Sequence, residues 1–291
     1  MVQVILNGLM IGGVYSLIAV GLTMVHGVMK IVNFAQGDFL MVGMYATLLL
    51  YGLLTPGAAP YVLILPVAVI MFLFGLMVFR TTIYKVIGKG DSNYILLTLG
   101  LSYLLQNIAQ LIFGPDYRSL AVSNDLKFAS ISLADNFISV PRLVAFGAAL
   151  ILVILMSFFL NKTDIGRAMR ATAEDRTIAT GLGVNTKVIY ILAFGLGTVF
   201  AGISGLLLTP IFFVYPLAGA PFSSIAMTVI VLGGLGNIKG AMVGGIIIGL
   251  VESFVSGYVN LEMAKVAIDL VLLLVLMFKP FGLFGKGARK A

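Results

Sequence analysis

The sequence contains no cysteine, a single histidine and few charged residues. Only 10% of its 291 residues are Lys, Arg, Asp or Glu, against about 25% in ordinary soluble domains. The absence of cysteine excludes disulfides, thiolate chemistry and Cys-ligated metals, and the one histidine, His26, cannot build a metal site by itself. With one histidine and no cysteine, a catalytic nucleophile and its general base are also hard to assemble. We therefore predict no catalytic residues, no metal site and no cofactor.

The few charges are segregated, and the stretches between them are apolar. Hydrophobic residues make up 60% of the chain and the mean hydropathy is +1.13. Each charge-free stretch reaches or approaches the roughly 20 residues that a membrane-spanning helix needs. The chain is therefore expected to lie in a lipid bilayer as an all-α, polytopic helical bundle. The charge-free stretches are residues 1–29, 39–79, 92–115, 143–161 and 188–238.

Eight hydrophobic blocks are predicted, and residues 1–291 are expected to form a single transmembrane domain whose apolar N-terminus is a retained span. The block at 223–256 is too long for one ordinary helix and is interrupted by a glycine-rich run around Lys239. It predicts two short crossings or a re-entrant pair, giving 8–9 crossings in all; the alternative is a tight turn at the cytoplasmic surface. The blocks cover residues 4–25, 38–53, 61–79, 94–113, 143–160, 189–209, 223–256 and 264–279.

Basic loops predict the orientation of the bundle. Residues 80–91 and 162–187 are rich in Lys and Arg and should be cytoplasmic, whereas residues 114–142 balance both signs and should face outward. Counting back places the N-terminus outside and residues 26–37 inside, as a short turn. The same rule accounts for the net charge of +7, so no nucleic-acid binding is expected.

The C-terminal tail is again basic and is predicted to be cytoplasmic. An even number of crossings must then separate it from Lys187. The cations of the tail are Lys279, Lys286, Arg289 and Lys290.

The loop at residues 162–188 is the most informative segment. Its Ala-rich, charged sequence predicts an exposed helix of about three turns closed by a glycine C-cap. Arg167, Arg170 and Glu174 would share one face of that helix. A small apolar surface for a partner would be formed by Ala168, Ala171, Ala179 and Leu182.

Residues 170–184 read Arg170-Ala171-x-Ala173-Glu174-Asp175-x-x-x-Ala179-x-x-x-Gly183-Val184. This pattern closely resembles the coupling loop of the permeases of branched-chain amino acid ABC importers. In that family the loop docks on the ATPase subunit. The resemblance implies ATPase-coupling roles for Arg167, Arg170, Ala171, Glu174, Asp175, Ala179 and Gly183.

Other segments resemble the same family in order and spacing, over nearly the whole chain. Gln36 departs from the pattern, because relatives often have His there, and the amide argues against a proton-linked role. The matching segments are Gly12-Gly13-Val14-Tyr15-Ser16-Leu17, residues 27–38, Gly100-Leu101-Ser102 with Gln106-Asn107, Gly233-Gly234-Leu235-Gly236 and Lys279-Pro280-Phe281-Gly282-Leu283-Phe284-Gly285.

The resemblance implies a permease subunit in the bacterial inner membrane that forms part of the translocation pathway of an ATP-driven importer of branched-chain amino acids. Its implied partners are a second related permease, two ABC ATPase subunits that hydrolyse the ATP, and a periplasmic substrate-binding protein. A permease for urea or short-chain amides shares the same motifs and stays open as an alternative. An ion-driven secondary transporter is a further alternative, but it would usually carry more ionisable groups inside the membrane than Asp38 and Asp269.

Polar residues within spans are costly and so mark candidate pathway positions. The alternative for each is a hydrogen bond between helices. Glu252 and Asp269 are expected to pair with one another or with Lys265, and small residues around Gly197 should form a close-packing face. The pathway candidates are Asn7, Asn33, Gln36, Asp38, Ser102, Gln106 and Asn107.

Overall fold

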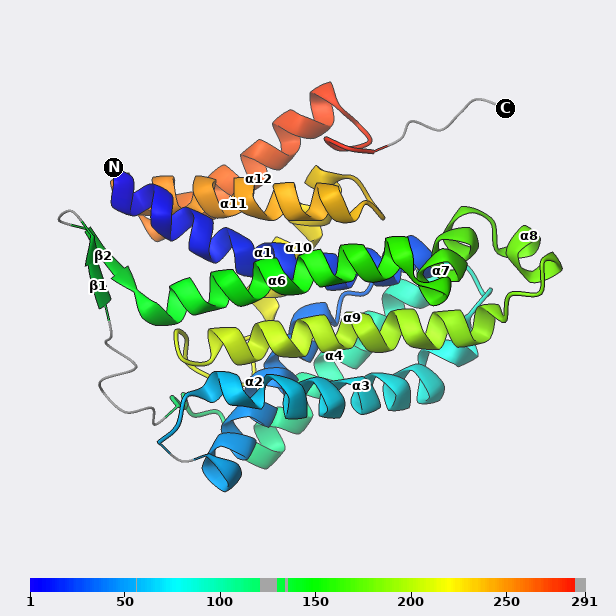
Figure 1. The fold of residues 1–291 in the computed structure, drawn as a ribbon, viewed down its shortest axis with the longest axis horizontal. Coiled ribbons are helices and arrows are strands. Elements are labelled where there is room, and N and C mark those ends of the chain that lie inside the picture. The colour runs from blue at the N-terminus through cyan, green and yellow to red at the C-terminus, as the bar shows by residue number, and fades with distance from the viewer. Residues whose placement is uncertain (56, 121–129, 134–135, 286–291) are drawn as a thin grey trace.

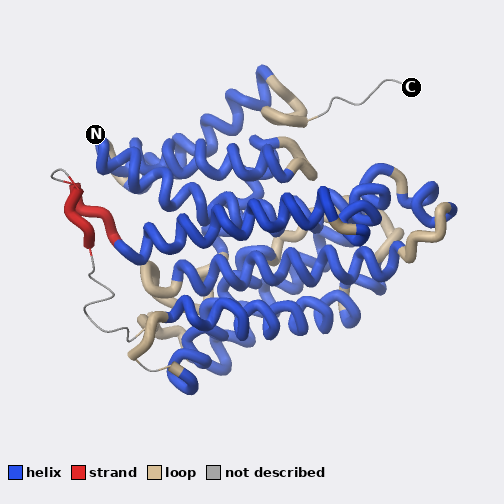
Figure 2. Tube along the Cα trace, viewed as in Figure 1, coloured by secondary structure: helices blue, strands red, loops and turns tan. Residues whose placement is uncertain are grey.

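The computed structural model describes residues 1–55, 57–120, 130–133 and 136–285. Most of these residues are helical, and two short strands form a hairpin at one end (Figure 2). The predicted all-α, polytopic bundle is therefore confirmed. The helices are α1 (Val2–Met29), α2 (Gln36–Leu54), α3 (Ile64–Thr81), α4 (Asp91–Phe113), α6 (Val140–Lys162), α7 (Asp164–Glu174), α8 (Arg176–Gly181), α9 (Thr186–Leu208), α10 (Ala220–Gly233), α11 (Ile238–Tyr258) and α12 (Leu261–Phe278).

The remaining elements are short. The 3₁₀ turns Pro60–Leu63 and Ile83–Val86 flank α3. Strand β1 (Ser130–Leu133) pairs antiparallel with β2 (Asn136–Ser139), within the loop predicted to face outward. Several charged residues that were used to predict the orientation lie outside the described residues. They are Asp125, Lys127, Asp135, Lys286, Arg289 and Lys290.

Seven helical segments among the described residues are long and apolar enough to cross a membrane. They match the first six predicted blocks and the second half of the seventh. The last block, α12, is helical as predicted but carries three charges, Glu262, Lys265 and Asp269, in its first half.

The helices run between two ends of the bundle (Figure 1). At one end, here named the hairpin end, β2 lies against the N-terminus: the Gln3 side chain accepts from the Phe137 amide (3.0 Å) and donates to its carbonyl. At the other end, named the α7–α8 end, Lys30, Arg170 and Lys239 line one cavity. Helices α1 and α6 lead from the hairpin end to the α7–α8 end, and α9 leads back.

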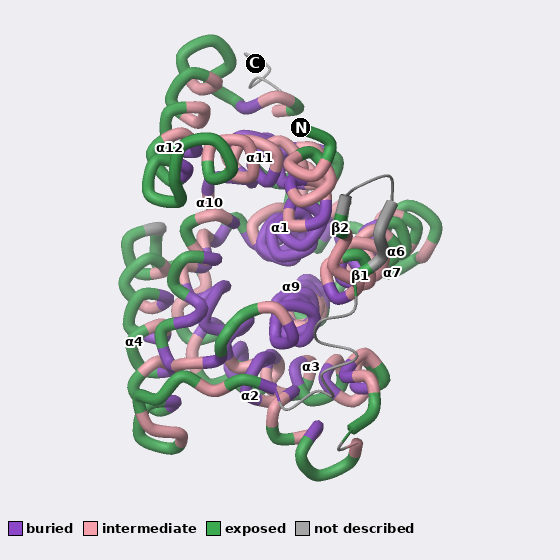
Figure 3. The backbone as a smooth tube through the Cα atoms, turned by 90° about the vertical axis from the view of Figure 1, so that its left-hand side faces the viewer, coloured by how far each residue is buried: buried purple, intermediate pink, exposed green. Residues whose placement is uncertain are grey.

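Helices α1 and α9 form the centre of the bundle, with α4 and α12 at its margin (Figure 3). In their most apolar stretches, 89% of α1 and 83% of α9 are buried, against 22% of α4. Glycines allow this close packing, because an added Cβ would strike the neighbouring backbone. A Cβ at Gly12 of α1 would lie 2.9 Å from the Gly245 carbonyl oxygen of α11, and one at Gly43 of α2 would lie 2.5 Å from the Gly202 Cα of α9.

The small residues predicted on α9 pack closely against neighbouring helices, but they do so against three different helices and not on one face. Gly197 packs against the Gly21 carbonyl of α1, Gly202 against Met71 of α3, and Gly205 against the backbone of α2. Small residues let helix axes approach closely in the membrane, where packing supplies much of the association energy.

The block at 223–256 is broken as predicted. Helices α10 and α11 meet at a tight turn over residues 234–237, where Gly234 (φ 103°) and Gly236 (φ 81°) adopt backbone angles that favour glycine. The turn lies at the α7–α8 end, as the alternative of a tight turn around Lys239 predicted, and α10 and α11 are separate helices on either side of it. Residues 279–285 lie beside this turn, where the Leu283 amide donates to the Leu232 carbonyl (2.8 Å).

The prediction that residues 26–37 form a short turn on the cytoplasmic side is wrong, because residues 26–29 and 36–37 are helical. Helix α1 continues to Met29, Lys30 is exposed, and the chain then turns into the bundle. Gln36 and Gly37 are buried, and the Gln36 side chain reaches Gly197, the central residue of α9. Helix α2 therefore begins at mid-depth in the bundle.

Candidate functional site

The non-helical segment that enters the bundle is held by two amides predicted as pathway residues. Asn33 accepts a hydrogen bond from the Ala35 amide (3.2 Å) and donates to the Gln36 side chain (3.4 Å). Gln36 donates in turn to the carbonyl of Gly197 (3.3 Å). Both amides are 1% exposed. Their observed role is hydrogen bonding within and between helices, which keeps irregular backbone satisfied where water is excluded.

A serine from α10 completes this support. Ser223 donates to the Phe34 carbonyl (3.1 Å) and accepts from the Gly37 amide (2.8 Å). One hydroxyl therefore binds the backbone on both sides of the residue where α2 begins. Thr98 of α4 donates to the Val32 carbonyl (3.4 Å). The role of Ser223 was not predicted, because no sequence signal places it beside residues 34–37.

Asp38 lies at the start of α2, next to this segment, and forms a cluster with α4. Gln106 donates to Asp38 Oδ1 (2.9 Å) and approaches the Ser102 hydroxyl (3.1 Å). Asp38 is 1% exposed, and its second oxygen, Oδ2, makes no hydrogen bond to any described residue. The predicted stripe of Ser102 and Gln106 toward protein is thus confirmed, but Gln110, expected to continue it, is exposed.

Two other predicted pathway residues lie apart from this cluster. Asn7 is at the hairpin end, where Arg142 Nη1 donates to it (3.4 Å). Asn107 is exposed and donates to the Tyr103 carbonyl of its own helix (2.7 Å). The structure therefore brings together Asn33, Gln36 and Asp38 with Ser102 and Gln106, and leaves Asn7 and Asn107 outside.

Glu252 of α11 does not form the predicted ion pair. Among the described residues, no ion pair joins Glu252 to Lys265. Its carboxylate instead lies beside the Tyr15 hydroxyl of α1. Because α11 packs along α1 through glycines, the two side chains meet in the contact between these helices.

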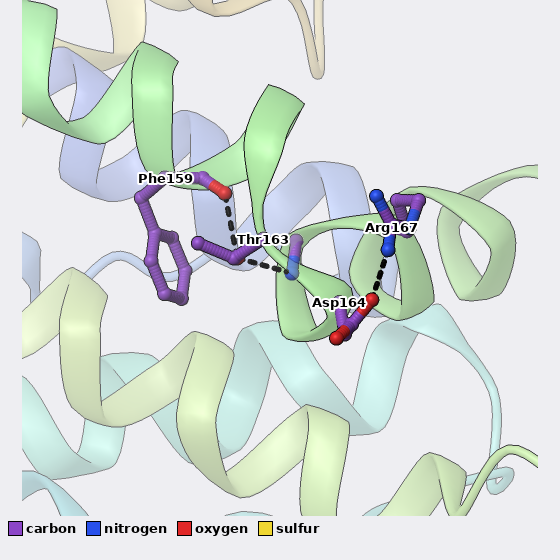
Figure 4. A network of polar contacts seen from close by, with 5 residues as sticks. Phe159, Thr163, Asp164 and Arg167 are labelled. Atoms are coloured by element: carbon purple, nitrogen blue, oxygen red, sulfur yellow. Dashed lines mark hydrogen bonds and ion pairs between the residues drawn. The ribbon is translucent and has the colours of Figure 1, made fainter.

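The junction of α6 and α7 is a tight, fully bonded turn (Figure 4). Thr163 alone separates the helices: its hydroxyl donates to the Phe159 carbonyl (2.7 Å) and accepts from the Gly166 amide (3.0 Å), which caps α7. A Cβ at Gly166 would lie 2.5 Å from the Leu160 carbonyl oxygen, so only glycine fits. Arg167 pairs with Asp164 in the first turn of α7.

The predicted single helix at 164–187 is two helices. Helix α7 spans three turns as expected but ends at Glu174 without a glycine, and Asp175 then caps α8 by accepting from the Ile178 amide (2.9 Å). Gly183 (φ 85°) closes α8 instead, with the Val184 amide donating to the Ala179 carbonyl (3.0 Å). This is the Schellman arrangement, in which a left-handed residue follows the helix.

The residues expected to meet a partner differ in exposure. Ala179 is 1% exposed, so its expected place in the exposed apolar surface is wrong. That surface is formed by Leu182, as predicted, and by Ile178, which are 77% and 63% exposed. Their spacing of four on a helix could have revealed the pair. Arg167, Arg170, Glu174, Asp175 and Gly183 are exposed, and Ala171 is half-buried.

No group of three or more metal-ligating side chains occurs among the described residues. The geometry offers two functional elements instead: a polar cluster around Asp38 at mid-depth, and an exposed helix pair fixed to the end of α6.

Comparison with known proteins identifies the family. Residues 4–278 match the family model described as branched-chain amino acid transport system / permease component. The chain is 31% identical to the high-affinity branched-chain amino acid transport system permease protein LivH of Escherichia coli (strain K12), over 98% of this chain and 95% of LivH. It is 30% identical to BraD of Pseudomonas aeruginosa, which carries the same description, over 98% and 95% of the two chains.

A more distant relative is LivM of Escherichia coli (strain K12), also a high-affinity branched-chain amino acid transport system permease protein. It is 25% identical over 93% of this chain and 67% of LivM. No solved structure matches the chain. The family model covers most of the chain, and LivH and BraD align with it almost end to end. The chain therefore belongs to the family of branched-chain amino acid transport permease components.

Proposed function

We propose that the chain is the permease subunit of an ATP-driven importer of branched-chain amino acids. The observation that carries the proposal is that a chain of this family presents a rigidly mounted, exposed helix pair, α7 and α8, at one end of a membrane bundle. Such a pair gives a separate ATPase a surface on which to dock, and the chain itself hydrolyses no ATP. The proposed docking surface combines the exposed apolar residues of α8 and its C-cap, Ile178 and Leu182, with the exposed charged residues Arg167, Arg170, Glu174 and Asp175.

The α7–α8 end faces the cytoplasm of a bacterial cell, and the protein resides in the inner membrane. Lys30, Arg170 and Lys239 gather at this end, which accords with the excess of Lys and Arg on the cytoplasmic side of membrane proteins. The C-terminus is then cytoplasmic and the β1–β2 hairpin faces the periplasm, where a substrate-binding protein would meet it.

A second, related permease completes the pathway, and two ATPase subunits drive the complex. The similarity of the chain to both LivH and LivM supports a pair of related permeases, since both relatives carry branched-chain amino acid permease names. The polar cluster at Asp38 borders α4, which is largely exposed in the single chain. A pathway along this side of the bundle explains why polar residues occur on so exposed a helix.

Helices that pack against one another connect the docking helices α7 and α8 to the proposed pathway. Helix α7 continues from α6 through Thr163 and contacts both α1 and α9. Helix α1 leads into residues 30–35, and α9 holds Gln36 through Gly197. ATP-driven closure of the ATPases would displace α7 and so bias α1 and α9 between two arrangements, opening the pathway on one side at a time.

Asp38 supplies the polar contact for the substrate within the bundle. A zwitterionic amino acid needs an anionic group for its ammonium, and Asp38 Oδ2 is a buried oxygen with no hydrogen-bond partner among the described residues. Gln106 of α4 donates to the other carboxylate oxygen, and Ser102 of the same helix accepts from Gln106.

Competition for uptake tests the substrate class. The complex, reconstituted in vesicles with its binding protein and ATP, should accumulate labelled leucine, and excess unlabelled isoleucine or valine should reduce this uptake whereas excess urea or acetamide should not. Uptake of labelled urea with no uptake of leucine would replace the proposal by an amide or urea permease. The Asp38→Asn variant should slow leucine uptake while retaining ATPase association.

A further inference from the structure

A cavity of about 540 Å³ opens at the α7–α8 end, between the end of α1, helix α7 and the turn joining α10 to α11. Three cationic side chains line it, Lys30, Arg170 and Lys239, with Glu174 as the carboxylate among its lining residues. Each cation comes from a different helix or helix end. The cavity therefore has a surplus of positive charge that no described side chain neutralises by an ion pair.

We propose that this cavity binds the phosphate headgroup of an anionic phospholipid from the leaflet at the α7–α8 end. The inference does not depend on the transported substrate. Cationic pockets between membrane helices on the cytoplasmic side suit such headgroups, because charge attraction and apolar burial act together there.

The backbone conformation at Lys30 indicates that the lysine side chain itself is needed at this position. Lys30 is the one non-glycine residue at positive φ in the described parts of the chain (φ 59°), and it ends α1 in a position where glycine is favoured. A lysine bears a conformational cost there that glycine would avoid. An anion bound by the ammonium explains why the costlier residue occupies the turn.

Lys239 is likewise placed where a bound anion would stabilise it. It lies in the first turn of α11, where the helix dipole disfavours a cation and favours an anion. Deeper in the cavity wall, Thr23 is 1% exposed and its hydroxyl has no hydrogen-bond partner among the described residues. This hydroxyl is available to a phosphate or ester oxygen.

The wall behind the cations favours a lipid over a free anion. Met24 and Val28 of α1 and Leu160 of α6 line the same cavity, so apolar surface begins directly behind the charged rim. Inorganic phosphate would use the rim alone. A phospholipid would use both, with its headgroup at the lysines and the start of an acyl chain on the apolar wall.

Lipid binding to the purified full-length chain tests the proposal. Native mass spectrometry in detergent should detect retained palmitoyl-oleoyl phosphatidylglycerol, and much less phosphatidylcholine with the same acyl chains. Lys30→Gly and Lys239→Gln should each weaken phosphatidylglycerol binding about fivefold. The matched control is Lys89→Gln, which removes an exposed lysine that does not line the cavity. Lys30→Gly should retain or raise the thermal stability, because glycine suits the left-handed turn, so its loss of binding cannot be ascribed to unfolding.

The remaining outcomes overturn the proposal. Equal binding of phosphatidylglycerol by the cavity variants and by Lys89→Gln would show that the cavity is not the site. If millimolar inorganic phosphate raises the thermal stability of the wild-type chain but not of the two cavity variants, and phosphatidylglycerol has no such effect, the cavity is a free-anion site and not a lipid site.

Discussion

Gln106 of α4 donates a hydrogen bond to the carboxylate of Asp38 at the start of α2, across 2.9 Å. The contact joins α4, the least buried of the seven candidate membrane spans, to the segment that turns into the bundle. It also leaves one oxygen of Asp38 buried and unpaired among the described residues. The importance of this hydrogen bond can be tested both by protein stability and by transport.

Gln106→Leu should destabilise the protein and slow leucine uptake. The substitution removes the donor to a buried carboxylate, and an unsatisfied buried polar group costs about 1–3 kcal/mol. Thermal unfolding in detergent and uptake by the reconstituted complex measure the two effects. Gln110→Leu is the matched control, because Gln110 lies one turn further along the same helix and is exposed. If both variants behave alike, the hydrogen bond to Asp38 has no importance of its own.

Gly43→Ala should separate α2 from α9. The new Cβ would lie 2.5 Å from the Gly202 Cα, and overpacking of this kind costs about 1–3 kcal/mol. Gly52→Ala in the same helix has nothing within 4 Å of its added Cβ, so it should leave the melting temperature unchanged or raise it. Size-exclusion profiles after heating compare the two. An unchanged profile for Gly43→Ala would contradict the close glycine contact.

Thr163→Val should loosen the connection between α6 and α7. It removes the hydroxyl that caps α7 and bonds back to Phe159, at a cost of about 1 kcal/mol. If α7 transmits the action of the ATPases, fewer leucine molecules should enter per ATP hydrolysed, while the substrate concentration for half-maximal uptake stays unchanged. Thr163→Ser keeps the hydroxyl and should behave as wild type. Unaltered coupling in Thr163→Val would argue that α7 does not act through this turn.

Leu182→Asp should weaken docking of the ATPase. Leu182 is 77% exposed at the end of α8, and burying a leucine against a partner contributes about 1.5–3 kcal/mol. Association measured by co-purification should fall about tenfold or more, whereas Leu182→Met keeps the apolar contact and should associate normally. Gly183→Pro should have a similar effect to Leu182→Asp, since proline cannot adopt the φ of 85° at this position. Normal association of Leu182→Asp would remove α8 from the docking surface.

Much of the fold could be predicted because the length of an apolar stretch and the placement of charges around it can be read within one segment of the chain. The break in residues 223–256 followed from its length, its glycines and the need for an even number of passes before the basic tail. The close packing of α9 followed from its run of small residues. Each of these signals lies within one segment of the chain.

The errors arose where distant segments decide the outcome. His26 and Lys30 indicated a short turn on the cytoplasmic side, but residues 31–37 enter the bundle because Ser223, Thr98 and Gly197 satisfy their backbone and side chains. These partners come from three other helices, and periodicity in one segment cannot reveal them. The division of the docking element at Asp175 did have a local signal, since Asp is a favoured helix N-cap.

The energy source for transport tests the central claim most directly. Vesicles that hold the chain, its permease partner and the binding protein should accumulate labelled leucine only when the ATPase subunits and ATP are present, and dissipating the ion gradients should not reduce the rate. Leucine uptake that is driven by an ion gradient in vesicles lacking the ATPases would contradict the assignment of this chain as an ATP-driven permease.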